Sequence, residues 1–215
     1  MKQQYLKDLY YLFFGKLTIF SLYWYRLRFC LTKPANVFVN LGCGTSYIRG
    51  MINIDGNILR KKDIWLDITL GLPFPNDSID GIYASHIIEH FNINNVRRLF
   101  SEFHRVLKPG GRVRVVVPSL EYAIQSYIQG DILKLSDFPE KYKSIGGRFN
   151  NSLLCANQHF IMLDFSFLEE LLADSGFCSV SRAKIKASDY FKEEHMQFEF
   201  IDQFSDAFLY VECRK

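Results

Sequence analysis

The fold of this chain is decided by residues 37–44, which read VFVNLGCG: an apolar, β-branched run that ends in a glycine-rich turn. Such a run is typical of a buried parallel strand. Gly42 and Gly44 have no Cβ, so the turn can adopt positive φ and a small molecule can lie directly against its peptide groups. The stretch therefore predicts a strand that leads to a nucleotide-like ligand.

The composition describes an ordinary folded protein. The 215 residues are enough for one domain with a full core, and 48% of them are hydrophobic and 23% charged. A net charge of +3 with scattered Lys and Arg predicts no nucleic-acid partner. The cysteines show no CxxC spacing, which favours free thiols in the cytoplasm; they are Cys30, Cys43, Cys155, Cys178 and Cys213.

Residues 1–33 predict an amphipathic, aromatic helix that precedes a domain formed by residues 34–215. One face of this helix collects apolar side chains: Leu6, Leu9, Phe13, Leu17, Phe20, Trp24, Leu27 and Leu31. Lys16 interrupts a stretch too short to span a membrane, and no signal-peptide cleavage site follows. Two alternatives stay open. The helix packs on its own domain or a second subunit, or it lies on a membrane surface with Trp24 at headgroup level and basic residues toward anionic lipid, namely Lys2, Lys7, Arg26 and Arg28.

From residue 34 onward, strands and helices alternate, which predicts an α/β fold with a mostly parallel sheet and ligands at the carboxyl ends of its strands. We expect a helix after Asn94, a turn at 108–111, a helix with a capping box at Ser166, and a closing pair of strands at 177–185 and 207–213. Residues 118–162 predict a less regular segment, either a substrate lid or a solvated connector. The earlier strands are expected at 37–41, 52–54, 64–66, 81–84 and 113–117.

The spacing around the glycine turn excludes a dinucleotide fingerprint, because Tyr47 stands where GxGxxG requires its last glycine. Asp55 ends the second predicted strand, where a carboxylate can accept hydrogen bonds from both hydroxyls of a ribose. Asp67 follows the third. Cys43 is expected to fill space beside the ligand rather than to act as a nucleophile.

In order along the chain, the motifs NLGCG, NID, LPFPNDSIDGIYASHIIEH and RVLKPGGRVRVVVP resemble those of class I S-adenosylmethionine-dependent methyltransferases, in particular the small bacterial, methyltransferase-11-like type. The resemblance is good over 37–118 and weak over 168–215. It implies a Rossmann-like fold with a closing antiparallel strand and S-adenosyl-L-methionine as cofactor. It also implies cofactor contacts from Asn40, Gly42, Cys43, Gly44, Asp55, Asp67, Ile68, Ser85 and His86. Of these, the glycines would contact the methionine part, Asp55 the ribose, Asp67 and Ile68 the adenine, and Ser85 and His86 the region near the sulfonium.

The chain departs from the family pattern in two respects. An acid usually stands at Asn40, and often a glycine at Ser46. The crossovers are also short, since nine residues separate Leu41 from Met51 and eight separate Asp55 from Ile64, whereas a parallel crossover usually takes a dozen or more. We therefore expect the first crossover helix to be reduced to a turn, with the N-terminal helix as a candidate cover for that flank.

Residues 86–90 read HIIEH, the H-x-x-E-H pattern of a zinc peptidase helix. Because the pattern directly follows a predicted strand, at a position where relatives carry similar residues, we predict no metal site. The candidate catalytic residues are instead His86, His90 and His159, whose imidazoles titrate near neutral pH and could accept a proton, with Glu89 as a further candidate base.

The predicted function is S-adenosylmethionine-dependent methyl transfer to a small-molecule or glycan-type acceptor by a cytoplasmic enzyme. Two alternatives remain: a catalytically inactive cofactor-binding or scaffold protein of the same fold, and a zinc hydrolase that uses the HIIEH segment. The N-terminal helix adds a homodimer contact or a peripheral membrane contact to the predicted partners.

Overall fold

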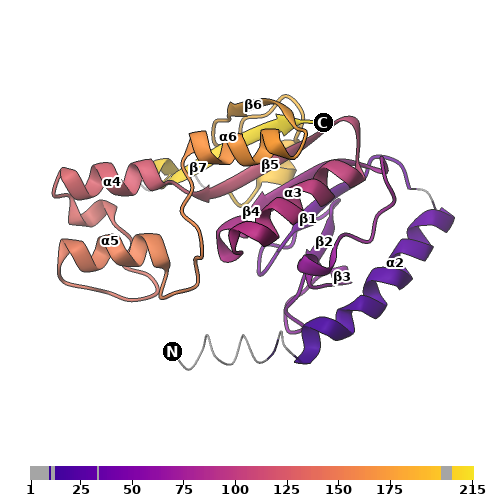
Figure 1. The fold of residues 1–215 in the computed structure, drawn as a ribbon, viewed down its shortest axis with the longest axis horizontal. Coiled ribbons are helices and arrows are strands. Elements are labelled where there is room, and N and C mark those ends of the chain that lie inside the picture. Colours follow the sequence, from indigo (N-terminus) through magenta and orange to yellow (C-terminus); the bar gives the residue numbers. More distant parts are fainter. Residues whose placement is uncertain (1–9, 11–12, 33, 200–204) are drawn as a thin grey trace.

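The computed structural model describes residues 10, 13–32, 34–199 and 205–215. Within these residues one sheet of seven strands has the order β3-β2-β1-β4-β5-β7-β6 (Figure 1). β7 is antiparallel to β5 and β6, and the pairs among the first five strands are parallel. The expected Rossmann-like sheet with a closing antiparallel strand is confirmed. The strands are β1 Phe38–Leu41, β2 Ile52–Asp55, β3 Ile64–Trp65, β4 Ile79–Ser85, β5 Leu107–Pro118, β6 Cys178–Arg182 and β7 Phe208–Arg214.

Helices α3 (Ile93–Val106) and α6 (Phe165–Asp174) pack on one face of the sheet through apolar side chains, among them Phe100, Phe103 and Leu168. Both helices begin at caps that the sequence prediction missed. The Asn92 side chain accepts a hydrogen bond from the N–H of Asn95, so α3 starts before Asn94, and Asp164 rather than Ser166 caps α6. Short side chains that accept hydrogen bonds are frequent in both stretches, and spacing alone does not show which one caps.

The other face of the sheet has no crossover helix in its first half. The described residues 42–51 and 56–63 form only turns, which confirms the expected shortening. A segment from the C-terminal region, residues 183–199 with the 3₁₀ helix η5 (Glu193–Met196), covers this face instead. Its Phe191 and Met196 pack with Met51 and Tyr83 in a second apolar cluster. A late part of the chain therefore replaces the missing early helices.

A buried ion network fixes this covering segment. Arg114 on β5 is fully buried and donates to Glu199 and Glu212 at 2.7 Å each. The guanidinium also donates to the carbonyls of Lys184 and Ala187. Buried ion pairs stabilise a structure only when their hydrogen bonds are satisfied, as they are here. The network joins residues 184–199 to the sheet.

The N-terminal region packs on the domain through a different face from the one that its apolar spacing suggested. α2 (Thr18–Thr32) follows the 3₁₀ turn η1 (Gly15–Leu17) and buries Thr18 and Leu22, with Tyr25 and Phe29 partly buried against the core. The predicted apolar face is exposed; Phe20, Trp24 and Leu31 are 72%, 64% and 77% accessible, and Phe13, Leu17 and Leu27 are exposed as well. Leu6, Leu9, Lys2 and Lys7 lie outside the described residues.

Hydrogen bonds place α2 along the β3 edge of the sheet (Figure 1). The hydroxyl of Tyr25 donates to the carbonyl of Asp63, and that of Tyr10 donates to the carbonyl of Gly56, directly after Asp55. α2 thus covers the flank left open by the short crossovers. In the described part of the chain, no helix is long and apolar enough to cross a membrane.

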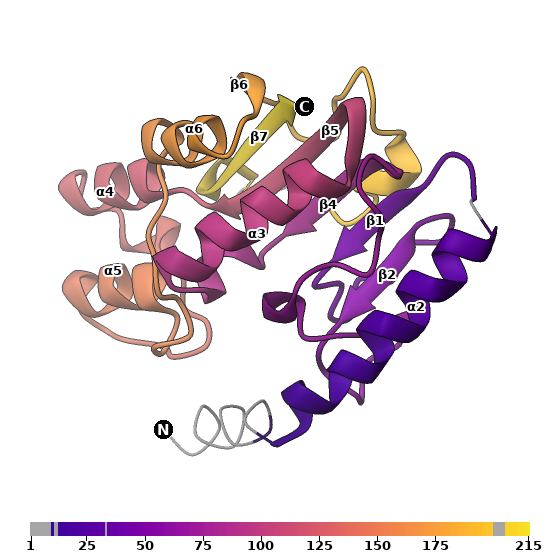
Figure 2. The same ribbon diagram turned by 45° about the vertical axis from the view of Figure 1, so that its right-hand side comes forward.

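Residues 118–162 differ from the irregular segment that was predicted. They contain α4 (Leu120–Ile128), the 3₁₀ turn η4 (Ile132–Lys134) and α5 (Ile145–Leu154). The side chain of Ser144 caps the N-terminus of α5, and its C-terminus is closed by the backbone of Cys155, which is in the left-handed region and donates its N–H to the carbonyl of Asn151. α4 and α5 lie beyond the carboxyl end of the sheet, at the opposite end of the molecule from α2 (Figures 1 and 2). The remaining 3₁₀ turns are η2 (Ile68–Leu70), η3 (Ile88–His90) and η6 (Ser205–Ala207).

Candidate active site

The glycine turn after β1 is held between two neighbouring strands. Gly42 and Gly44 have φ values of +65° and +50°, which L side chains rarely adopt. A Cβ on Gly42 would lie 2.5 Å from Cγ1 of Ile87, so this glycine is required by the segment that follows β4. A Cβ on Gly44 would meet nothing within 4 Å, so bare backbone faces open space there. The turn therefore has a cradle of the kind that a small cofactor requires.

Asp55 lies beside this cradle and is almost buried, at 9% exposure. One carboxylate oxygen accepts a hydrogen bond from the N–H of Gly44, and the other accepts one from the N–H of Asn57, both at 2.7 Å. Charge-assisted bonds of this kind are among the strongest in proteins. Asp55 thus orders the glycine turn from the end of the neighbouring strand.

The structure explains why Asn40 stands where the family usually has an acid. Its side chain is buried and donates from Nδ2 to the carbonyl of Ser46 and to Oδ1 of Asn53. A carboxylate could not donate either bond. These two hydrogen bonds fix the turn that replaces the first crossover helix. An amide at position 40 therefore suits the shortened crossover.

Cys43 has no nucleophilic character. Its side chain is buried, and burial raises the pKa of the thiol to about 12, with the nearby charge of Asp55 as the next contribution. The thiolate is the reactive form of cysteine. At neutral pH, Cys43 is a small apolar group within the turn.

The turn after β3 carries Asp67 and Ile68. The Asp67 carboxylate accepts hydrogen bonds from the N–H and hydroxyl of Thr69 and so caps η2. The N–H of Asp67 donates to the hydroxyl of Thr18 on α2 at 3.0 Å. Ile68 is buried. The N-terminal helix therefore contacts the turn that the family resemblance associates with adenine.

The segment after β4 begins with Ser85 and His86. His86 has a φ of +52°, and its side chain is 44% exposed. Its ring lies 4.7 Å from that of Phe208 at an interplanar angle of 85°. Only Ile88–His90 is helical in HIIEH, as a single 3₁₀ turn. A zinc peptidase requires both histidines on one α-helix, so the zinc hydrolase alternative is wrong in its structural premise.

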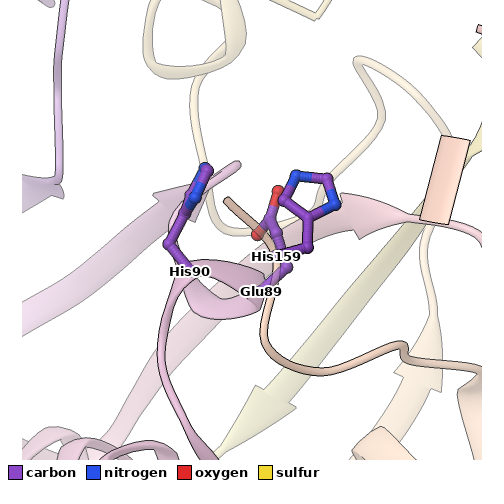
Figure 3. Close-up of side chains that lie close together, drawn as sticks. All are labelled: Glu89, His90 and His159. Carbon is purple, nitrogen blue, oxygen red and sulfur yellow. The ribbon is translucent and has the colours of Figure 1, made fainter. Parts of the chain in front are cut away.

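A histidine-glutamate cluster lies at the same edge of the sheet. Glu89 and His90 come from the turn after β4, and His159 comes from the segment that follows α5 (Figure 3). One possible ligand atom from each residue lies within 4.8 Å of the others. The N–H of Phe160 donates to the carbonyl of Glu89 at 2.8 Å, which fixes the two segments to each other. The sequence indicated each of these residues as a candidate base but did not predict that they lie close together.

The carboxylate of Glu89 is buried, with 3% of its side chain exposed, and neither oxygen has a hydrogen-bond partner among the described residues. Nδ1 of His86 is 3.4 Å from Oε1 of Glu89, outside hydrogen-bond geometry. Burial acts to raise the pKa of this carboxyl, but His86 and His90 outweigh it and bring the pKa below its ordinary value. Glu89 is therefore ionised at neutral pH.

Two cavities lie near these residues. One of about 610 Å³ lies between α2 and α3, and its lining includes Arg26, Ile68 and Phe91 but not the two glycines or Asp55. The other, of about 20 Å³, is lined by Glu89, His159 and Pro118. The larger cavity adjoins the predicted adenine turn, and the smaller one adjoins the histidine-glutamate cluster.

Comparison with known proteins agrees with the motif order. Residues 43–115 match the family model described as methyltransferase domain. A search of curated proteins found no match. An S-adenosylmethionine-dependent methyltransferase from Archaeoglobus fulgidus is similar in structure, with 17% identity, coverage of 96% of this chain and 99% of the other, and a TM-score of 0.51. One from Mesorhizobium loti has 18% identity, coverages of 90% and 98%, and a TM-score of 0.50.

A third similar structure is the phosphoethanolamine N-methyltransferase 2 of Haemonchus contortus in complex with S-adenosyl-L-methionine. The identity is 14%, the coverages are 92% of this chain and 56% of the other, and the TM-score is 0.50. At these identities the structures establish a shared fold. The matched model covers residues 43–115, and the fold of the chain is that of the class I S-adenosylmethionine-dependent methyltransferases. The bare backbone at Gly44 beside Asp55 fits a ligand such as S-adenosyl-L-methionine, which the third of these structures contains.

Proposed function

We propose that this enzyme methylates a small-molecule or glycan-type acceptor at the edge of the sheet between the glycine turn and the histidine-glutamate cluster. The observation that carries the proposal is the packing of Ile87 against Gly42, because it brings the segment after β4 against the cofactor turn. An acceptor there would lie between the cofactor and the polar side chains of His86, His90 and His159.

The proposed roles of the chain follow from its contacts. Gly42, Cys43 and Gly44 would hold the methionine part of the cofactor, and Asp55 the ribose hydroxyls. Asn40 would support them from within, Asp67 and Ile68 would bind the adenine, and Ser85 would lie near the sulfur. When bound, S-adenosylmethionine supplies an electrophilic methyl group on a positively charged sulfur.

His86 is the proposed proton acceptor among the three histidines, because its side chain is the accessible neighbour of the ionised Glu89. An oxygen or nitrogen acceptor would lose its proton to this imidazole. The other contribution of the chain is alignment and the exclusion of water. In this proposal, α5 and the residues after it bound the acceptor space.

The acceptor class is supported by aromatic side chains on residues 118–162. Tyr127, Phe138, Tyr142 and Phe160 are 44%, 73%, 40% and 60% exposed. Aromatic rings offer flat apolar surfaces to ring-shaped ligands, and tyrosine adds a polar hydroxyl. Phe160 directly follows His159, so one such ring adjoins the proposed acceptor space. This segment is our proposed substrate lid.

Calorimetry with S-adenosylmethionine and S-adenosylhomocysteine tests the cofactor part. We expect wild-type binding, a loss of at least about tenfold in Asp55→Ala because charge-assisted bonds to the turn disappear, and no change in Asp174→Ala, an exposed acid at the end of α6. Absence of wild-type binding at roughly millimolar ligand would contradict the proposal. A screen of metabolites and saccharides for demethylated cofactor tests the acceptor; binding without turnover on any acceptor would favour the scaffold alternative.

We further propose that the exposed face of α2 contacts an anionic membrane surface. Residues 10–32 contain no Asp or Glu. Arg26 and Arg28 are exposed on α2 together with Phe20 and Trp24, and Lys16 is exposed in the preceding turn η1. A helix with aromatic residues and only basic charges suits the interface of an anionic bilayer. The charge pattern favours lipid over a second copy of this basic helix, because like charges repel.

Sedimentation with vesicles of phosphatidylserine and phosphatidylcholine tests this contact. Binding should be stronger than to phosphatidylcholine alone, should weaken with salt, and should be lost on replacing Phe20, Trp24 and Leu27 by serine. The matched control replaces Ile128 and Leu133, exposed apolar residues at the other end of the molecule, and should keep binding. A dimer that the triple replacement dissociates, without vesicle binding in the wild type, would support the second-subunit alternative.

A further inference from the structure

We propose that Glu89, His90 and His159 form a site for a first-row divalent metal ion, and that this ion binds an oxygen of the methyl acceptor. The sequence argued against a metal because HIIEH directly follows a predicted strand, at a position where relatives carry similar residues. The structure supplies a different triad, in which His159 from the far end of residues 118–162 takes the place of His86.

The hydrogen bonds of the two imidazoles fix their tautomers. Nδ1 of His90 lies 2.9 Å from the carbonyl of Gln158, and Nδ1 of His159 lies 2.9 Å from the carbonyl of Leu153. A carbonyl only accepts, so both Nδ1 atoms carry hydrogen, and in the neutral rings both Nε2 atoms hold a lone pair. Histidines that ligate metals usually have this second bond, which orients the ring.

The carboxylate of Glu89 gives a second, independent indication. It is buried, yet neither oxygen is hydrogen-bonded within the described part of the chain. A buried charge without hydrogen bonds is costly. A divalent cation would bond to a Glu89 oxygen and to a nitrogen of each imidazole at the same time.

The separations allow a metal after a small closure. The three ligand atoms lie within 4.8 Å of one another, whereas bonds of about 2.0 to 2.1 Å in a tetrahedral site place ligands roughly 3.4 Å apart. The cavity of about 20 Å³ that Glu89 and His159 line has room for one water molecule or ion. The His90 and His159 rings, with centroids 5.1 Å apart, lie close enough to share one ion.

The backbone before His159 is also arranged around this position. Cys155, Ala156 and Asn157 are three consecutive residues with φ between 45° and 64°. Non-glycine residues pay a conformational cost in this region, and such strain clusters at functional sites. Here the strained turn brings His159 back toward Glu89, and the bond between Phe160 and Glu89 fixes it there.

The donor set indicates the kind of metal. Two imidazole nitrogens and one carboxylate oxygen suit Zn²⁺, Fe²⁺, Mn²⁺ or Co²⁺, whereas Mg²⁺ and Ca²⁺ prefer oxygen alone. Three protein ligands leave at least one position for an exogenous oxygen. This step rests on the proposed function: the exogenous oxygen would be the hydroxyl of the methyl acceptor. The ion would lower the pKa of that hydroxyl, and its proton would leave to His86 or to solvent.

The test measures metal content directly. The full-length protein is stripped with a chelator, loaded with Zn²⁺ or Co²⁺, desalted and analysed by mass spectrometry for bound metal. We expect about one ion per chain in the wild type, visible absorption typical of Co²⁺ with nitrogen ligands, and a loss of affinity of at least about a hundredfold in Glu89→Gln and in His159→Asn. His104→Gln changes a histidine on α3 beside Phe177, remote from the cluster, and should load like the wild type.

Circular dichroism of each variant separates loss of metal from loss of fold. The site is contradicted if the wild type retains no metal above the level of Glu89→Gln, or if folded Glu89→Gln loads normally. Calorimetry with S-adenosylhomocysteine on the same samples keeps the two proposals distinct. Metal loading without cofactor binding would leave the metal site standing and overturn the proposed methyl transfer, and the reverse result would remove only the metal.

Discussion

Two turns at the carboxyl edge of one sheet each carry a buried acidic side chain, and the two side chains differ in their hydrogen bonding. After β2, both oxygens of Asp55 accept backbone N–H groups, from Gly44 and Asn57. After β4, the oxygens of Glu89 have no hydrogen bond among the described residues. The first turn is electrostatically complete as it stands. In our proposal a positive ligand completes the second turn, and this contrast supports our assignment of cofactor to one turn and cation to the other.

The backbone shows the same difference. The left-handed positions of the first turn are glycines, which adopt positive φ at little cost. In the second region the left-handed positions are His86, Cys155, Ala156 and Asn157, none of them glycine. The first turn is thus relaxed and the second is strained, which suggests that side chains matter at the second and bare backbone at the first.

The largest expected effect concerns the thiol within the first turn. Because its pKa is raised from 9.0 to about 12, the thiolate fraction of Cys43 at pH 8 should be about a thousandfold below normal. We expect iodoacetamide to label the exposed Cys30 and Cys178 in the native protein and to reach Cys43 only after unfolding, as peptide mass spectrometry would show. Labelling of native Cys43 at the rate of Cys30 would contradict a complete, closed turn.

The same thiol gives a pH dependence of stability. In the unfolded chain it loses its proton near 9.0, whereas in the folded chain it keeps the proton until about 12. The folded state therefore binds more protons in between, and the free energy of unfolding falls as the pH rises through this range. Cys43→Ala should flatten that slope in urea titrations, and an unchanged slope would contradict the shift.

Gly42→Ala should break both turns at once. The new Cβ would lie 2.5 Å from Ile87 at a φ of +65°, and strain together with overpacking costs about 3 kcal/mol, roughly a hundredfold in the folding equilibrium. We expect urea denaturation to show this loss, and the folded fraction to bind both S-adenosylhomocysteine and metal more weakly. Gly50→Ala is the matched control, because its φ is +83° but nothing lies within 4 Å. Equal losses in the two variants would show that Ile87 does not couple the turns.

These contacts also mark what the sequence could and could not predict. The order of motifs predicted the sheet, because each apolar run ends near a turn residue and patterns of this kind depend on local chemistry. The short crossovers were predicted by counting residues. Their replacement by residues 183–199 was not, since Arg114 meets Glu199 and Glu212 across 85 and 98 residues of chain.

The sequence left open, for a related reason, whether the apolar face of α2 packs on its own domain, on a second subunit or on a membrane surface. Apolar residues repeat with helical spacing on both faces, and periodicity cannot distinguish a face that meets its own domain from one that meets an external partner. The distinction rests on Thr18 and Tyr25, whose hydroxyls bond to Asp67 and Asp63. Likewise, His159 could be named as a candidate base, but its meeting with Glu89 depends on the backbone of 155–157.

His86→Asn should separate the second turn from the first. Asparagine tolerates the left-handed backbone at this position, so the fold should be kept while the imidazole 3.4 Å from Glu89 is lost. If His86 only neighbours the metal site, metal affinity should fall about tenfold and S-adenosylhomocysteine binding should change less. Competition with a chromophoric chelator measures the first and calorimetry the second. A fall of a hundredfold or more would make His86 a metal ligand itself.

Ala156→Gly should give the smallest effect and tests the strain of the second region. Glycine removes the steric cost of the left-handed conformation but adds entropy to the unfolded chain, and the balance should raise the free energy of unfolding by about 0.5 kcal/mol. Ala173→Gly, at an exposed position in the last turn of α6, lacks that strain and should lose about 0.5 kcal/mol in the same urea titration. Both variants should load metal like the wild type. If Ala156→Gly destabilises as much as Ala173→Gly, the turn before His159 is not strained, and its backbone no longer supports a functional role.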